Sequence, residues 1–260
     1  MNRLSVTLIT RDEEKNLPRL LASLGDLPDE IVLVDSGSTD RTCAIARQHG
    51  ARVIERPWTD FSDQKNFAAA QAKHQWILNL DADEELSPAL QAELQRWKGE
   101  PAAAVAYALP RKARYLGGWI LHSGWYPDPK LRLYRGDQAR FVGRLHESLV
   151  TRGPVGRFQG ELYHYTVNTL SEHLNRINRY TTLAAAELFA SGRRRWVLPL
   201  LLVPPWTLLR TFFFQQGFRD GYRGWLIAQM AACYTFLKYA KLGVLVRGGS
   251  LTSEPRSAKR

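Results

Sequence analysis

Residues 30–42 read EIVLVDSGSTDRT, and this stretch decides the fold. Its first part, residues 30–35, is a short run of mostly aliphatic residues, typical of a strand that is buried on both faces of a parallel sheet. An acid, a glycine and several hydroxyl residues follow directly, and a helical pattern then runs to a stop at Gly50. A strand, a polar turn and a helix make one unit of an α/β layer.

The same unit repeats on both sides of this stretch. Short apolar runs, each typical of a buried strand, occupy residues 4–10, 51–55 and 75–81. Leucines spaced at i, i+3, i+4 and i+7 predict a helix after the first run, with a stripe formed by Leu17, Leu20, Leu21 and Leu24. Ser87 followed by Pro88 marks the start of another helix. We therefore predict a Rossmann-like α/β domain with a parallel sheet.

The alternation of strands and helices stops near residue 100. Strand-like segments at residues 103–109, 130–135 and 145–150 predict a small antiparallel extension. From about residue 168 the pattern is helical, with apolar stretches at 196–209, interrupted by three prolines, and at 225–237. Neither stretch supplies the roughly 20 apolar residues of a spanning helix, so we expect none to span. The expected domains are 1–165, with a donor side at 1–100 and an acceptor side at 101–165, and a helical region at 166–260.

Charge is distributed unevenly along the chain. Residues 1–100 carry 12 Lys and Arg against 17 Asp and Glu, whereas residues 101–260 carry 24 against 8. The basic part lacks helix-turn-helix, RNP and zinc-finger patterns, so we expect no nucleic-acid partner. Cys43 and Cys233 are too few for a disulfide framework, and the first residues lack a signal-peptide core. These features favour a cytoplasmic protein.

Polar, mostly acidic residues follow each of the four predicted parallel strands. In open α/β sheets, ligands bind beyond the carboxyl ends of the strands, so these residues are expected to share one edge. Carboxylates gathered there repel one another unless a cation lies among them, and oxygen ligands suit Mg²⁺ or Mn²⁺. Asp81 and Asp83, in a DAD sequence at the end of the fourth strand, are the candidate ligands. A cation held there could bridge one of these carboxylates to a diphosphate.

Three segments together resemble the donor-site signatures of family 2 glycosyltransferases, which have the GT-A fold. They are LITRDEEKNL at 8–17, VDSGSTDRT at 34–42 and LNLDADEE at 78–85. The resemblance implies that Thr10 and Glu13 line a nucleoside pocket and that Asp35 contacts the base or ribose. It also implies that Asp81 and Asp83 hold the ribose and the metal, with Asp83 as the direct ligand.

A narrower resemblance covers the second half of the chain. GWYPDPKLRLYR at 124–135, GRLHESL at 143–149 and GFRDGYRG at 217–224 look like lipopolysaccharide-core β-1,4-glucosyltransferases that act on inner-core heptose. This resemblance implies transfer of glucose from a UDP-sugar, with inversion, to a core glycolipid. A polyprenyl-phosphate acceptor is the alternative, and a noncatalytic membrane-surface protein is the alternative of another class. The absence of GxGxxG after the first strand argues against a nicotinamide oxidoreductase.

An inverting transferase needs one base and several cations around the leaving diphosphate. Asp128 follows the aromatic pair Trp125 and Tyr126, which favours it as the base, and Glu147 is the alternative. Each acid also has a structural reading, as a turn residue before a proline and as an ion-pair partner of a nearby arginine. The candidate phosphate-binding cations are Lys65, Arg132, Arg135 and Arg144, although Arg132 and Arg135 lie on opposite faces of one strand. His146 is a further candidate metal ligand by the GT-A resemblance.

The C-terminal region combines basic and aromatic residues. Residues 191–260 carry 12 Lys and Arg against 2 Asp and Glu, and tryptophans and tyrosines flank the apolar stretches. This composition is typical of helices that bind the surface of an anionic membrane. Helices that pack in an ordinary core are the alternative. The first reading predicts a peripheral protein on the cytoplasmic face of the inner membrane.

Overall fold

The computed structural model describes residues 2–143 and 147–251, and it divides into two compact units. The first unit contains Met1–Ala113 and Pro127–Thr166. The second contains Arg114–Tyr126 and Val167–Arg260. The chain therefore passes from the first unit to the second at Arg114, returns to the first at Pro127, and enters the second again at Val167.

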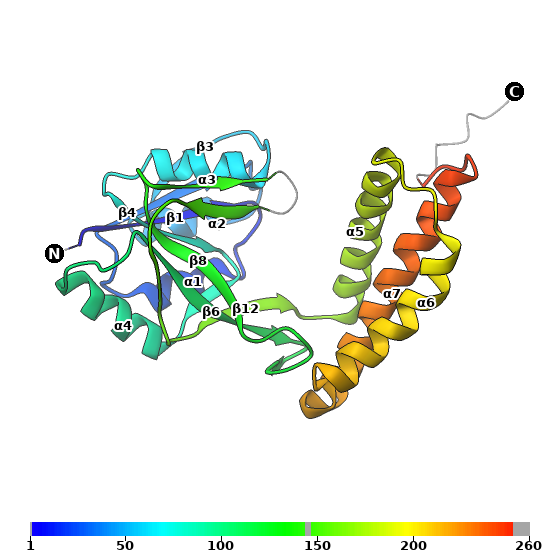
Figure 1. Cartoon of the computed structure of the whole chain (residues 1–260). Coiled ribbons are helices and arrows are strands. Elements are labelled where there is room, and N and C mark those ends of the chain that lie inside the picture. Colours follow the sequence, from blue (N-terminus) through cyan, green and yellow to red (C-terminus); the bar gives the residue numbers. More distant parts are fainter. Residues whose placement is uncertain (1, 144–146, 252–260) are drawn as a thin grey trace, which may run out of the picture. The chain divides into compact units, whose positions relative to one another are not determined.

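The predicted parallel strands are present in the first unit. They are β1 (Leu4–Thr10), β2 (Glu30–Asp35), β3 (Arg52–Glu55) and β4 (Trp76–Asp81). They pair in parallel in the order β3-β2-β1-β4, so all four carboxyl ends lie at one edge (Figure 1). The β1 and β2 registers set Thr10 beside Asp35, and the β1 and β4 registers set Ile9 beside Asp81.

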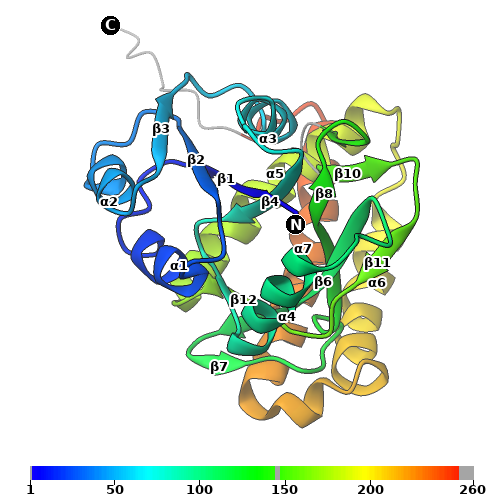
Figure 2. The ribbon, with the colours of Figure 1, turned by 90° about the vertical axis from the view of Figure 1, so that its left-hand side faces the viewer.

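Four helices accompany these strands: α1 (Leu17–Leu24), α2 (Thr42–Gln48), α3 (Phe61–Ala70) and α4 (Pro88–Gly99). Figure 2 shows α3 on one face of the parallel strands, with α1 and α2 on the other. All four leucines of the predicted α1 stripe are buried against the apolar side of β1, so that prediction is confirmed. The opposite side of β1 carries Ser5 and Thr7, and α3 buries Lys65 there. This side of the sheet is therefore polar near the carboxyl ends of the parallel strands. We call this edge, which includes Thr10, Asp35 and Asp81, the donor edge.

Antiparallel pairing extends the sheet beyond β4. The added strands are β5 (Glu84–Leu86), β6 (Ala106–Tyr115), β8 (Asp128–Arg135) and β12 (Leu162–Val167), in the order β4-β8-β6-β12-β5. The short strands β7 (Gly118–Trp119) and β11 (Val155–Arg157) pair with β6. A separate hairpin consists of β9 (Ala139–Val142) and β10 (Ser148–Thr151). The predicted α/β fold with a small antiparallel extension is thus confirmed.

The second unit is helical. It consists of α5 (Leu170–Ala190), α6 (Val197–Leu209), the π-helix η1 (Arg210–Phe214), the 3-10 helix η2 (Gly217–Asp220) and α7 (Gly221–Val246). Tyr115, Ile120, Val167 and Ile227 form its small apolar core. The carboxylate of Asp220 accepts hydrogen bonds from the N–H groups of Leu121 and His122, both at 3.1 Å, and from the Ser123 hydroxyl at 2.8 Å. These bonds attach residues 121–123 to the helices.

The expectation that prolines interrupt residues 196–209 is wrong. Helix α6 continues through Pro204 and Pro205, while Pro199 lies in its first turn, where the missing N–H has no helical partner to lose. Together α6 and η1 form the segment Val197–Phe214, with a mean hydropathy of 1.6. By length and composition alone, this segment is long and apolar enough to cross a membrane. The segment has 18 residues and includes Arg210, so the expectation that neither stretch spans stays a prediction.

Candidate functional site

The predicted nucleoside-binding residues meet at the carboxyl ends of β1 and β2. The Thr10 hydroxyl donates to Asp35 Oδ1 at 3.0 Å. Asp35 Oδ2 accepts from the backbone N–H groups of Gly37 at 3.0 Å and Ser38 at 2.7 Å, a turn in which Gly37 has a φ of +87°. Burial alone would raise the pKa of Asp35, but the hydrogen bonds led by Ser38 outweigh it and lower this pKa. Asp35 is therefore held in place as an anion.

Glu13 lies close to several other acidic side chains at this edge. Its Oε2 accepts a hydrogen bond from Asn16 at 2.9 Å. Burial is the largest cause that raises the pKa of Glu13, and the nearby carboxylates, first Asp83, then Asp40 and Asp81, raise it further against the Asn16 bond. The acids that follow different strands are therefore close enough to repel one another, as the pattern of polar strand ends predicted.

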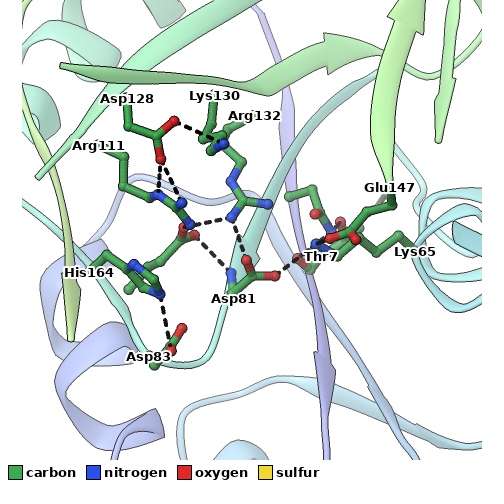
Figure 3. Close-up of polar contacts among 12 residues, drawn as sticks. Thr7, Lys65, Asp81, Asp83, Arg111, Asp128, Lys130, Arg132, Glu147 and His164 are labelled. Carbon is green, nitrogen blue, oxygen red and sulfur yellow. Dashed lines mark hydrogen bonds and ion pairs between the residues drawn. The ribbon is translucent and has the colours of Figure 1, made fainter. Parts of the chain in front are cut away.

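Asp81 lies between two buried cations (Figure 3). Lys65 Nζ is 2.9 Å from Asp81 Oδ1, and the Arg132 guanidinium donates to Asp81 Oδ2. Lys65 is 1% exposed and Arg132 is 5% exposed, so water screens these pairs little. Burial opposes ionisation, but Arg132 and then Lys65 lower the pKa of Asp81. Both oxygens of Asp81 thus already have cationic partners within the protein.

Glu84 belongs to the same network, and the sequence interpretation missed it. Its side chain is fully buried, with Oε1 2.5 Å from Arg132 Nη2 and Oε2 accepting from the Asp81 N–H at 2.9 Å. Burial raises the pKa of Glu84, with Arg132 acting in the opposite direction. The pKa of Arg132 is raised because Asp81 and Glu84 outweigh its own desolvation. Arg132 therefore supports the acids directly, whereas the sequence suggested contact with a diphosphate.

Asp83 points away from these cations, toward His164. The distance from His164 Nε2 to Asp83 Oδ2 is 3.2 Å. The pairing of β12 with β5 sets His164 opposite Glu84, and the Tyr165 N–H donates to the Asp83 carbonyl at 2.9 Å. His164 was also missed, because it stands in an ordinary strand 81 residues after Asp83. The other histidine candidate, His146, lies outside the described residues, as does Arg144.

The two candidate bases lie at opposite ends of this network in Figure 3. Asp128 uses both oxygens in ion pairs: Oδ2 is 2.6 Å from Arg111 Nη2, and Oδ1 is 2.9 Å from Lys130 Nζ. Burial opposes ionisation, but Lys130 and Arg111 lower the pKa of Asp128. Glu147 Oε1 is 3.1 Å from Lys65 Nζ. The structure therefore places Glu147 beside Lys65, which also pairs with Asp81, whereas Asp128 pairs with Arg111.

Most of the predicted site residues that the structure describes lie together at the donor edge, whereas Arg135 lies apart from them. Arg135 pairs with Asp137 at 3.1 Å, at the end of β8 far along the strand from Asp128. A hollow of about 710 Å³ lies at that same end, lined by residues 136–140 and 150–152. Neither belongs to the donor edge, where the carboxyl ends of the parallel strands meet.

Comparisons with known proteins identify the family. Residues 5–153 match the model of glycosyl transferase family 2. The lipopolysaccharide core biosynthesis glycosyltransferase LpsC of Rhizobium meliloti is 32% identical, over 92% of this chain and 91% of the relative. An uncharacterized glycosyltransferase of Rickettsia typhi is 31% identical, over 93% and 87%. The crystal structure of Staphylococcus aureus TarS 1–349 is 15% identical, over 95% and 92%, with a TM-score of 0.46.

The family match spans more than half of the chain, and the relatives cover nearly all of it. The parallel half-sheet with its antiparallel extension is the GT-A-like arrangement that the motifs implied. The recognition of the family from three donor-site segments is therefore confirmed. This chain belongs to glycosyl transferase family 2.

Proposed function

We propose that this protein is an inverting, metal-dependent hexosyltransferase that moves glucose from a UDP-sugar to a lipopolysaccharide core or a related cell-envelope glycolipid. The observation that carries the proposal is that Asp81 and Asp83 have different partners. Asp81 is neutralised by Lys65 and Arg132, whereas the Asp83 carboxylate pairs with His164. The relative LpsC is named for lipopolysaccharide core biosynthesis, and this name supports the acceptor class.

Asp83 and His164 have the chemistry of a divalent-cation site. A carboxylate oxygen and an imidazole nitrogen together suit Mn²⁺, and the carboxylate also suits Mg²⁺. Within residues 2–143 and 147–251, no three His, Cys, Asp or Glu side chains form a metal-binding group. Oxygens of the donor diphosphate would therefore complete the coordination. The cation supplies positive charge that stabilises the leaving diphosphate.

Glu147 is the base in this proposal. The acceptor hydroxyl oxygen forms a bond to the anomeric carbon, the bond from that carbon to the diphosphate breaks, and the hydroxyl proton passes to the Glu147 carboxylate. The sequence favoured Asp128 for this role. However, both oxygens of Asp128 are held by cations that lower its pKa, which makes it a weak proton acceptor. Asp128 instead holds Arg111, whose guanidinium lies 3.8 Å from Glu84.

The same proposal locates the protein at the cytoplasmic face of the inner membrane. UDP-sugars are water-soluble donors, whereas the acceptor is a lipid, so the enzyme has to work at their boundary. The excess of cations in residues 191–260 supports attraction to an anionic bilayer.

Titration calorimetry of UDP with and without Mn²⁺ tests the metal site. Asp83→Asn and His164→Ala should each weaken Mn²⁺-dependent UDP binding by at least about tenfold, the scale of losing a metal contact. Asp137→Asn and His74→Ala are matched controls, because both residues lie in the first unit outside the donor edge. Mn²⁺ spectra recorded by electron paramagnetic resonance should change on UDP addition only when both residues are present. Unchanged UDP affinity in both variants would refute the metal site.

A transfer assay tests the reaction itself. UDP release should require both a nucleotide sugar and a core-oligosaccharide lipid, and UDP-glucose should be the best donor of a small panel. Release with polyprenyl phosphate in place of the core lipid would identify the alternative acceptor. A protein that binds vesicles but releases no UDP from any combination would be the noncatalytic membrane protein.

A further inference from the structure

The second unit exposes an apolar helix face that its own core does not use. None of the residues in α6 is buried, and only 6% of Val197–Phe214 is buried. Leu198, Leu201, Leu202 and Trp206 are 54 to 65% exposed. Their spacing of three to four residues places them on one side of the helix. Contiguous apolar surfaces of this kind mark an interaction site on a folded protein.

The polar groups of α6 suit an apolar environment. Among its 13 residues, the side-chain groups that can form hydrogen bonds are the Thr207 hydroxyl, which donates to the Val203 carbonyl at 2.8 Å, and the indole N–H of Trp206. A hydroxyl that is satisfied within its own helix costs little to remove from water. The indole N–H of Trp206 suits the interface of a bilayer, where it can reach polar headgroups while the rest of the face contacts acyl chains.

Cations lie at both ends of α6, and the second of these positions, Arg210, is the first residue of η1. Arg193, Arg194 and Arg195 precede α6, and Arg210 follows it directly. The Arg247 guanidinium stacks 4.9 Å over the Trp196 ring, at the first end. An apolar face with arginines at each end complements the acyl chains and the anionic headgroups of a bilayer at the same time.

The opposite side of the unit, formed by α5, carries charged residues beside partly exposed leucines. Helix α7 packs against both α6 and α5, and Figure 1 shows it between them. Helix α5 exposes Arg176, Arg179 and Glu187 along its length. The Lys241 amine of α7 donates to the Asn178 carbonyl and the Thr181 hydroxyl of α5, so this cation is used within the unit. A bundle with one apolar side and one charged side fits a membrane surface, whereas crossing the membrane would bring the α5 charges into hydrocarbon.

We propose that the helical unit is a monotopic anchor, in which α6 and η1 lie in the plane of an anionic bilayer with their leucine face inserted and α5 facing water. This inference rests on the membrane location proposed above and names the surface responsible. The partner is a lipid surface with negatively charged headgroups. Binding to vesicles does not require sugar transfer, so the anchor and the reaction are tested separately.

Flotation with liposomes tests the surface. The triple variant Leu198→Ser, Leu201→Ser and Leu202→Ser should bind vesicles of equal parts phosphatidylglycerol and phosphatidylcholine at least about tenfold more weakly than wild type. The matched control changes Leu170, Leu174 and Leu183 of α5 to Ser, which are 38 to 43% exposed, and it should bind like wild type. Wild type should bind pure phosphatidylcholine weakly. Calorimetry of UDP with Mn²⁺ on the same samples shows whether the first unit is intact, whatever the flotation result.

A second measurement separates lying in the plane from crossing. In a background with Cys43→Ser and Cys233→Ser, single cysteines are introduced by Ser191→Cys and Arg219→Cys, at the two ends of the α6 and η1 segment. With protein added to the outside of sealed vesicles, a membrane-impermeant maleimide should label both positions. Protection of one position alone would mean that the segment spans, and would overturn the proposal.

Three other outcomes also contradict the anchor. Wild type that floats with neither vesicle would show that the α6 face is covered by something else. If sedimentation then shows an oligomer that the α6 variant abolishes, the face is a contact between copies of this chain. Equal losses in the α6 and α5 variants would mean that the leucine face has no special part in binding.

Discussion

The donor edge of the first unit buries charged side chains, whereas the α6 face of the second unit exposes apolar ones. The two regions depart in opposite ways from the usual distribution of side chains. At the donor edge, charged side chains are buried: Glu84 is 0% exposed and Lys65 is 1% exposed, and both have charged partners. On α6, apolar side chains remain in solvent. Buried charges must be paired within the protein, because water cannot stabilise them. Exposed leucines need a partner from outside. The first region is complete as folded, and the second is not.

The largest expected effect concerns the pairing at the donor edge. Arg132→Met should lower the free energy of unfolding by about 3–5 kcal/mol, because it leaves the buried Glu84 carboxylate and the partly buried Asp81 carboxylate without their shared cation. Arg135→Met, on the same strand, should change it by less than about 1 kcal/mol, because its partner Asp137 is half exposed. Urea titrations measure both. Similar values for the two variants would show that the donor edge tolerates unpaired charge and would remove the contrast drawn above.

The next effect separates a fully paired acid from a partly engaged one. Glu147→Gln should lower turnover by about 10²-fold, the scale of losing a general base, while UDP affinity stays the same. Asp128→Asn should lower turnover less, because we assign Asp128 to holding Arg111. Steady-state UDP release gives both numbers. A larger loss in Asp128→Asn would return the base to the residue that the sequence favoured.

The pH dependence of stability should differ in sign for two neighbouring acids. The pKa of Asp81 is lowered, against its burial, by Arg132 and Lys65. Its contribution is present above the unfolded value of about 3.9 and is lost as the pH falls toward the folded pKa. The pKa of Glu84 is raised by burial. Its contribution is present below the unfolded value of about 4.3 and is lost as the pH rises through the folded pKa.

Two substitutions should reveal these opposite slopes. Asp81→Asn should make the loss of stability below about pH 4 shallower, and Glu84→Gln should reduce the loss as the pH rises above about 4.3. Each slope changes by at most about 1.4 kcal/mol per pH unit, the value for one proton. Urea unfolding at a series of pH values measures this. Variants whose curves run parallel to wild type would show that the two acids titrate alike in the folded and unfolded states.

The smallest effect lies in the second unit. The Thr169 hydroxyl accepts from the Glu172 N–H at 3.2 Å, and Glu172 accepts from the Thr169 N–H at 3.2 Å, which caps α5. Thr169→Ala should cost about 1 kcal/mol of unfolding free energy, and Thr169→Ser should cost less. Thermal unfolding in solution, without vesicles, compares them. A loss as large as that of Arg132→Met would mean that local helix contacts support this unit far more than its small core suggests.

The sequence predicted the elements whose signals are local. The leucine stripe of α1 and the Ser87 cap of α4 depend on residues within two turns of helix, and both are present. The gathering of Thr10, Asp35 and Asp81 followed from the rule that parallel strands end together. These features gave the GT-A-like fold and most of the donor edge.

The sequence did not predict features that depend on pairing between distant segments. His164 meets Asp83 only because β12 pairs with β5 in one register. From the sequence, Glu84 was interpreted as one more acidic residue in a loop. In the structure it lies in β5 and is buried against Arg132 of β8. The helix through Pro204 and Pro205 was missed for another reason, since a proline lowers helix propensity without forbidding a helix. Register and tertiary packing decide such cases, and neither is visible in a single sequence.

The interleaving of the two units limits how the gene can be divided. Residues 114–126, which begin with the last two residues of β6 and end before β8, belong to the helical unit, and Asp220 holds Leu121, His122 and Ser123 there. A truncation after Thr166 would therefore remove Val167 and Ile227 from the cluster around Tyr115 and Ile120 and leave an apolar loop in water. The helices cannot be exchanged as a cassette with one junction. A chimera with a relative must carry residues 114–126 and 167–251 from the same parent.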